Sequence, residues 1–232
     1  MIVGLLGAMV EEIEPLLEYF KNYEVVEYAD NKFYLADYNE HKIVIAYSKI
    51  GKVHAALTAA TMIEKFKIEA LLFSGVAGAI DENLHIGDLI VASALCQHDL
   101  DITAFGHPYG YVPEGKVCYE SDDSLRELAQ RVAKENNVDL KEGIIATGDQ
   151  FIADEKKKEW IKRAFNASAI EMEGASVAVV AHSLKIPFLV IRSISDAAGM
   201  DAGFDFDEFL KTSAKVSAVF LTDILDKLIA KS

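Results

Sequence analysis

The stretch PFLVIRSI at residues 187–194 is the most hydrophobic strand that the sequence predicts. Its apolar side chains fall on both faces, which is typical of a central parallel strand covered on two sides. A second buried strand is expected at residues 71–74, where the chain runs into the glycine-containing segment 74–78. These two segments predict a sheet that carries helices on both faces.

Strand and helix patterns alternate along the rest of the chain. Further strands are expected at residues 2–6, 33–38, 42–47, 89–95, 143–147 and 169–172, and helices follow most of them. No internal repeat, low-complexity segment or linker divides the 232 residues. We therefore predict an α/β fold, with one domain over residues 1–232 and a central mixed, largely parallel sheet flanked by helices.

Composition and charge exclude several classes of function. The chain is 51% hydrophobic and 26% charged, as ordinary soluble globular proteins are. Its net charge of −14 repels phosphate backbones and anionic membranes, so neither nucleic acid nor a membrane is expected as a partner. The sequence predicts neither a signal peptide nor a membrane-spanning run. With Cys96 and Cys118 as the only cysteines and no CxxC pair, a reducing cytoplasm fits better than secretion.

Candidate ligand-binding residues follow the predicted strands, because ligands of open α/β sheets bind beyond the carboxyl ends of the strands. Five such segments gather carboxylates, glycines and apolar side chains with almost no cations: 7–12, 74–78, 148–151, 171–173 and 195–196. Such a pocket suits a neutral or cationic polyol better than a phosphate. The glycines of segment 74–78 lack the spacing and the lysine of a phosphate loop, and tight packing also accounts for them.

Three carboxylates stand out among these segments, namely Glu12, Glu173 and Asp196. Each also has a structural interpretation, since acids are favoured in the first turn of a helix and aspartate caps turns. The apolar stripe of the first helix places Glu11 in water and Glu12 at the stripe boundary, so Glu12 is the one that can face a site. The convergence of the three segments favours a functional role.

Cationic and metal-binding side chains have simpler interpretations. Arg192 lies within an apolar strand and needs a carboxylate partner there, which indicates a structural ion pair. The lysines at 156–158 indicate a solvated helix face. The six histidines show no spacing typical of metal ligands, so the sequence supports no metal site.

Several segments together carry a family signature: GLLGAMVEEIEPL, SKIGKVHAA, FSGVAGA, DLDITAFGHPYG, ATGDQFI, AIEMEGASVA, and RSISDAAG followed by FDFDEFL. In this order they resemble the 5′-methylthioadenosine/S-adenosylhomocysteine nucleosidases of the nucleoside phosphorylase superfamily. The match spans almost the whole chain. The two segments AIEMEGASVA and RSISDAAG, at their expected places, argue strongly against coincidence.

The resemblance implies hydrolysis of the N-glycosidic bond of adenine thionucleosides to adenine and a free sugar, without cofactor or metal. This reaction needs an acid to protonate the purine and a base to activate water at the anomeric carbon. The resemblance implies that Asp196 is the acid, Glu12 the base, and Glu173 the acceptor of hydrogen bonds from the ribose hydroxyls. Asp196 then needs a raised pKa, while Glu12 must be ionised.

Substrate-binding residues also follow from the resemblance. Phe151 is expected to stack on adenine, Ile152 to bind it through its main chain, and Ser195 to position Asp196. The predicted substrate-binding set is Met9, Ile50, Ser74, Ala77, Gly78, Phe151, Ile152, Glu171, Met172, Ser195, Ala198 and Phe206.

Related enzymes are homodimers in which the neighbouring subunit completes the pocket for the 5′ substituent. In this chain that role falls to Ile102, Phe105 and Pro113. His107 stands where some relatives carry tyrosine, which leaves the fine specificity for the 5′ tail open. Some bacterial members also cleave 6-amino-6-deoxyfutalosine in menaquinone synthesis. The sequence does not rank this substrate against methylthioadenosine, S-adenosylhomocysteine or deoxyadenosine.

Two alternative functions remain. A phosphate-dependent nucleoside phosphorylase of the same superfamily needs cations to hold its phosphate, whereas this chain has Glu11 and Glu12 in the first strand-to-helix segment. A non-catalytic nucleoside-binding module is the second alternative, and the presence of all three carboxylates argues against it.

Overall fold

The computed structural model describes residues 1–196 and 202–230. Its strands are β1 (Ile2–Gly7), β2 (Glu24–Tyr28), β3 (Asn31–Tyr38), β4 (His41–Tyr47), β5 (Ala70–Ala79), β6 (Leu89–Gln97), β7 (Cys118–Glu120), β8 (Leu140–Thr147), β9 (Ala167–Glu171) and β10 (Phe188–Asp196). Its helices are α1 (Val10–Phe20), α2 (Lys52–Glu64), α3 (Asp123–Glu135), α4 (Glu155–Phe165), α5 (Gly174–Ser183) and α6 (Ala202–Ile229), with a short 3₁₀ helix η1 (Thr103–Phe105).

The strands form one sheet that closes on itself on one side of β5. From β5 the pairing runs through β9, β8 and β6 to β10, which pairs with β5 again. On the other side of β5 the sheet continues through β1, β4, β3 and β2 as an open extension. The neighbours β5, β10, β1 and β4 run parallel, whereas β2, β3 and β7 join by antiparallel pairing. The predicted α/β fold with a mixed sheet is confirmed.

Strand β10 has the two apolar faces that its sequence predicts. Phe188 and Val190 belong to one buried cluster of the core, and Leu189 and Ile191 belong to the other. Because successive side chains of a strand point to opposite faces, this alternation buries both sides of the sheet. The residues at the carboxyl edge of β10 therefore follow a strand that is packed on both faces.

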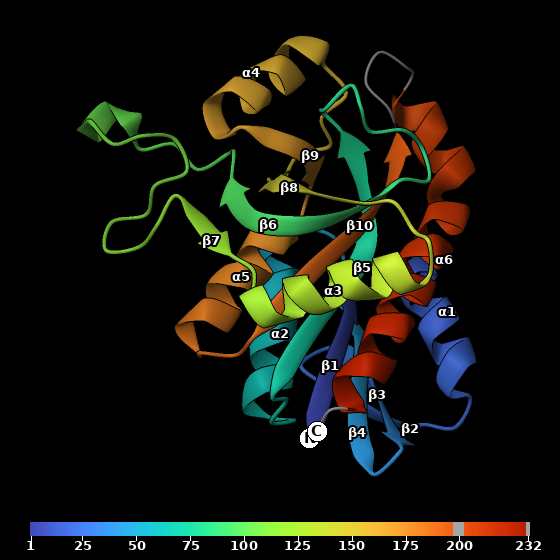
Figure 1. Cartoon of the computed structure of the whole chain (residues 1–232). Helices are drawn as coiled ribbons and strands as arrows, with labels where there is room; N and C mark the ends of the chain where they lie inside the picture. Colours follow the sequence, from blue (N-terminus) through green and yellow to red (C-terminus); the bar gives the residue numbers. More distant parts are fainter. Residues whose placement is uncertain (197–201, 231–232) are drawn as a thin grey trace.

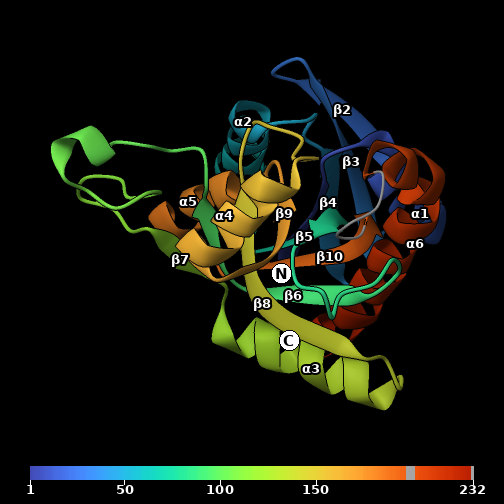
Figure 2. The ribbon, with the colours of Figure 1, turned by 90° about the horizontal axis from the view of Figure 1, so that it is seen from above.

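Helices cover both faces of the sheet. Helices α1, α3 and α6 contribute to the same buried cluster as Leu189, and α2 and α5 contribute to the cluster of Val190. Figure 1 shows α1 and α6 on one side of the strands and α2 and α5 on the other. Figure 2, seen from above, shows the long strand β8 curving between α3 and α4. None of the helices in the described part of the chain has the length and apolar character that a membrane crossing requires.

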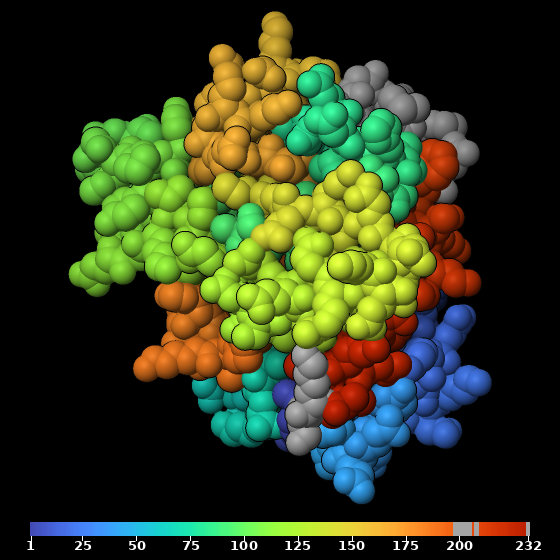
Figure 3. Space-filling view, viewed as in Figure 1, coloured from blue at the N-terminus to red at the C-terminus, as the bar shows by residue number. Residues whose placement is uncertain are grey.

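Residues 98–117, which we call the arm, leave the sheet after β6 and return at β7. The arm carries η1 and projects from the body of the protein in the ribbon and space-filling views (Figures 1 to 3). At its base, Cys96 and Cys118 face each other on β6 and β7 and are joined by a disulfide. The sequence favoured a reducing compartment, and this bond does not support that expectation, since disulfides are rare in such compartments.

Candidate active site

A cavity of about 470 Å³ lies where β1, β5, β9 and β10 end. Most of the predicted catalytic and substrate-binding residues line it: Met9, Glu12, Ile50, Ala77, Gly78, Phe151, Ile152, Glu171, Met172, Glu173, Ser195, Asp196 and Phe206. Four further residues line the cavity: Ala8, Val76, Gln150 and Ile170. The first three lie in segments that the sequence predicted to bind ligand but were not named individually. Sequence reasoning missed Ile170, which directly precedes the predicted residue Glu171.

Glu12 is buried in the first turn of α1, where its carboxylate accepts three main-chain hydrogen bonds. The amides of Ala8 and Met9 donate to Oε2, and the amide of Val76 donates to Oε1 at 3.0 Å. Burial raises the pKa of Glu12, while the positive charge of Arg192 and the amide donors oppose that rise. Glu12 is thus both the capping acid of α1 and a base of raised strength.

Asp196 ends β10 and is also buried, with 3% of its surface exposed. The Ser195 hydroxyl donates to its Oδ1 at 3.0 Å.

Two glycines of β5 make room for the carboxylates of Glu12 and Asp196. A Cβ atom at Gly75 would lie 2.6 Å from Oε1 of Glu12, and one at Gly78 would lie 2.6 Å from Oδ2 of Asp196. The close approach of each carboxylate to the main chain is therefore the physical reason for both glycines.

Glu173 lies between β9 and α5 and is 6% exposed. Its Oε1 accepts a hydrogen bond of 2.7 Å from the amide of Gly51, at the start of α2. Burial, together with the negative charges of Glu171 and Glu12, raises the pKa of Glu173 to about 8. Glu173 therefore keeps its proton to a higher pH than an exposed glutamate does.

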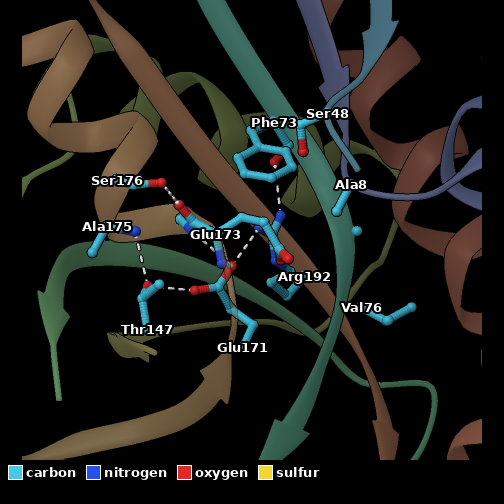
Figure 4. Close-up of polar contacts among 12 residues, drawn as sticks. Ala8, Ser48, Phe73, Val76, Thr147, Glu171, Glu173, Ala175, Ser176 and Arg192 are labelled. Atoms are coloured by element: carbon cyan, nitrogen blue, oxygen red, sulfur yellow. Dashed lines mark hydrogen bonds and ion pairs between the residues drawn. The ribbon is translucent and has the colours of Figure 1, made fainter. Parts of the chain in front are cut away.

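Glu171 is neutralised by Arg192 in a buried network at the centre of the site (Figure 4). Its Oε2 accepts from Nη2 of Arg192 at 2.7 Å and from the amides of Glu173 and Gly174. The Thr147 hydroxyl donates to the other oxygen, Oε1. The predicted ion-pair role of Arg192 is thus present in the structure. Glu171 reaches the cavity wall as predicted, but protein donors occupy both of its carboxylate oxygens.

Apolar side chains surround the rest of the cavity. The rings of Phe151 and Phe206 meet edge to face with 5.6 Å between centroids. Met9 and Ile50 lie on the wall formed by the first turn of α1 and the segment before α2. Phe151 is half exposed, and Ile50 is 54% exposed, so both stand at the mouth of the cavity.

Some predicted residues lie elsewhere. Ser74 is fully buried within β5 and does not line the cavity. Ile102, Phe105 and Pro113 lie on the arm, outside this chain's own cavity. Ala198 falls outside the described residues. Within residues 1–196 and 202–230, no group of three or more His, Cys, Asp or Glu side chains is arranged to hold a metal ion.

Comparison with known proteins defines the class to which this fold and site belong. Residues 2–230 match the model of the phosphorylase superfamily. An aminodeoxyfutalosine nucleosidase of Campylobacter jejuni is 56% identical over 98% of this chain and 100% of its own length. A 5′-methylthioadenosine/S-adenosylhomocysteine nucleosidase of Staphylococcus carnosus is 37% identical over 98% of this chain and 100% of its own.

A solved structure agrees with these relatives. It is an Asp-to-Asn variant of the Helicobacter pylori nucleosidase with 5′-methylthioadenosine in its active site, 48% identical, with a TM-score of 0.95 over 97% of this chain and 98% of the other. This chain belongs to the 5′-methylthioadenosine/S-adenosylhomocysteine nucleosidase family, as its sequence motifs predict.

The raised pKa of Glu173 predicts a pH-dependent stability. The unfolded chain releases this proton near pH 4.5, whereas the folded protein keeps it up to about pH 8, so the group lowers stability as pH rises across that interval. Glu173→Gln removes this effect. We expect the variant to raise the melting temperature more at about pH 9 than at about pH 5, as measured by calorimetry. An equal shift at both pH values would contradict the assignment.

Proposed function

We propose that this protein hydrolyses the N-glycosidic bond of adenine nucleosides, with Asp196 as the acid, Glu12 as the base and Glu173 as the ribose-binding carboxylate. One observation carries this proposal: Glu12, Glu173 and Asp196 are all buried, and they line one cavity together with Phe151. The division of roles among the three carboxylates follows the resemblance of the sequence motifs.

The part of the cavity around Asp196 is proposed to bind the purine. Phe151 offers its ring to the base, and Ile152 offers main-chain groups in the same segment. Asp196, held by Ser195, donates a proton to the purine ring so that adenine leaves as a neutral molecule. Protonation of the leaving group matters because the anion of a purine is a poor leaving group in an apolar cavity.

The part of the cavity around Glu12 is proposed to bind the attacking water and the ribose. Glu12 takes a proton from the attacking water as positive charge develops on the sugar, and its raised pKa brings its basicity closer to neutral pH. Glu173 binds the ribose hydroxyls, and these hydrogen bonds strengthen as the ring gains positive charge. Met172 lies in the cavity wall beside it and supports the sugar.

The charge of the cavity favours water over phosphate as the nucleophile. Of its described lining residues, four are carboxylates and none is lysine or arginine. The guanidinium of Arg192 is 1% exposed and is held by Glu171, by two main-chain carbonyls and by the Phe73 ring. A phosphate dianion beside Glu12 would therefore be repelled in a region of low dielectric.

The substrates that we propose are 5′-methylthioadenosine, S-adenosylhomocysteine and 6-amino-6-deoxyfutalosine, with 5′-deoxyadenosine as a smaller analogue. They share adenine, ribose and a 5′ substituent. In the proposed complex adenine contacts Phe151, ribose contacts Glu173, and the 5′ substituent contacts Met9. Relatives named for aminodeoxyfutalosine and for methylthioadenosine both align over nearly the whole chain, which supports a common substrate class.

A homodimer completes this proposal. Ile50 and Phe151 leave the mouth of the cavity open, while Phe105 on the arm is 80% exposed. An apolar side chain so exposed on a projecting segment is typical of an interaction site. We assign the arm residues Ile102, Phe105 and Pro113 of one subunit to the 5′ pocket of the other.

The first prediction concerns the nucleophile. Purified protein incubated with 5′-methylthioadenosine is expected to release adenine and free methylthioribose at the same rate with and without phosphate, because the described residues that line the cavity include no lysine or arginine to bind phosphate. Mass spectrometry of both products checks this. Methylthioribose 1-phosphate as the product would mean a phosphorylase and a different role for Glu12. Tight binding without any turnover would favour the nucleoside-binding module.

The second prediction separates the acid from the base. Asp196→Asn is expected to lower kcat for 5′-methylthioadenosine by roughly a hundredfold or more while retaining substrate binding, because the purine is no longer protonated. Glu12→Gln is expected to trap substrate or product, since water lacks its base. Single-turnover kinetics and ligand titration check both variants. Near-normal turnover in Asp196→Asn would refute the acid assignment.

The third prediction concerns the arm. Phe105→Ala is expected to raise KM for 5′-methylthioadenosine by roughly tenfold, because an apolar wall of the 5′ pocket is lost. Val219→Ala, which truncates an exposed apolar residue on α6, is the matched control and is expected to leave KM unchanged. Sedimentation should find a dimer for the wild-type protein. A fully active monomer would contradict the shared pocket.

A further inference from the structure

Asp99, at the root of the arm, is hydrogen-bonded to the start of α2 and to the loop between β8 and α4. Its Oδ1 accepts a hydrogen bond of 2.6 Å from Nζ of Lys52, and its Oδ2 accepts one of 2.8 Å from the amide of Asp149. The side chains of Lys52 and Asp99 are only 17% and 14% exposed. Burial opposes ionisation of Asp99, but the donors outweigh it and lower the pKa of this carboxyl.

The same three residues are joined a second time. The amide of Lys52 donates to Oδ1 of Asp149 at 2.7 Å, and Nζ of Lys52 also donates to Oε1 of Gln97 at 3.2 Å. Lys52, Asp99 and Asp149 thus form a closed ring of hydrogen bonds, which we call the clasp. The clasp connects the start of α2, the root of the arm, and residues 148–152, which we call the adenine loop.

Two members of the clasp, Asp149 and Lys52, lie close in sequence to residues of the proposed substrate site. Phe151 lies two residues after Asp149 in the adenine loop. Gly51 directly precedes Lys52, and its amide holds the carboxylate of Glu173 at 2.7 Å. A displacement of Asp99 would therefore move the adenine-stacking ring and the donor to the ribose carboxylate together.

We propose that Asp99 and Lys52 are a positioning pair of the nucleosidase site, which holds the adenine loop and the start of α2 in register with the root of the arm. The inference rests on the proposed roles of Phe151 and Glu173. A partly buried ion pair is a poor source of stability, because desolvation offsets the attraction between the charges. Two charge-assisted hydrogen bonds to one planar carboxylate do fix the orientation of the groups that donate them.

The test is Asp99→Asn. Lys52 and the Asp149 amide donate to different oxygens of Asp99, and asparagine replaces one of these acceptors with an NH2 group, which only donates. We expect KM for 5′-methylthioadenosine to rise by roughly tenfold or more, with a smaller change in kcat, because binding to the adenine loop is lost in ground state and transition state alike. A role in stability alone lowers kcat with the folded fraction and leaves KM unchanged, and that result would overturn the proposal.

Matched variants sharpen the test. Asp37→Asn breaks an exposed Lys–Asp pair of 2.8 Å on β3 and β4 and is expected to leave KM unchanged. Lys52→Arg keeps the charge and is expected to retain most of the affinity, whereas Lys52→Met is expected to behave like Asp99→Asn. If Lys52→Met and Asp99→Asn both fold and keep the wild-type KM, the clasp has no positioning role.

A double-mutant cycle with Phe151→Ala shows whether Asp99 acts through the adenine loop. We expect the two losses in kcat/KM to be clearly less than additive, since Phe151→Ala removes what Asp99 positions. Full additivity would overturn the proposal. If KM rises in Phe151→Ala but not in Asp99→Asn, the positioning role of the clasp is refuted and the adenine role of Phe151 stands. If KM rises in Asp99→Asn but not in Phe151→Ala, the clasp is supported and the adenine role of Phe151 is refuted.

Discussion

The ion pair between Glu171 and Arg192 is the interaction on which the active site depends. Four carboxylates line one cavity, and this arginine is the cation that interacts with three of them. Burial raises the pKa values of Glu12 and Glu173, and the charges of Glu171 and Glu12 raise that of Glu173 further, while Arg192 opposes the rise at both. Loss of one partner of a buried pair typically costs about 3–5 kcal/mol, because the other charge is left uncompensated. The same pair therefore supports both the fold and the protonation states.

Much of this architecture was predictable from sequence, for reasons that differ between residues. The apolar segment 187–194 predicted a strand covered on both faces, and residues after the strands predicted where the cavity lies. Glu12 was distinguished from Glu11 by the helical stripe, and the structure buries Glu12 and leaves Glu11 partly exposed. These features depend on local periodicity, which a single sequence contains.

Other features depend on contacts between distant segments. The engagement of both Glu171 oxygens requires Thr147 and Arg192, which lie 24 and 21 residues away in sequence. Ser74 was predicted to bind substrate because it begins the segment 74–78 and lies within the family motif FSGVAGA, but the strand β5 continues through it and keeps it in the core. The pairing of Cys96 with Cys118 depends in the same way on the return of the arm to β6. A single sequence does not specify such pairings.

The fold alone does not decide between hydrolase and phosphorylase chemistry, and in the proposed function the charge of the cavity makes that choice. The two glycines of β5 have a further consequence for inhibitor design. A compound that rests against Gly75 and Gly78 contacts main chain that no larger side chain can cover without displacing Glu12 or Asp196. A larger residue at either position would therefore force the carboxylate that faces it to move.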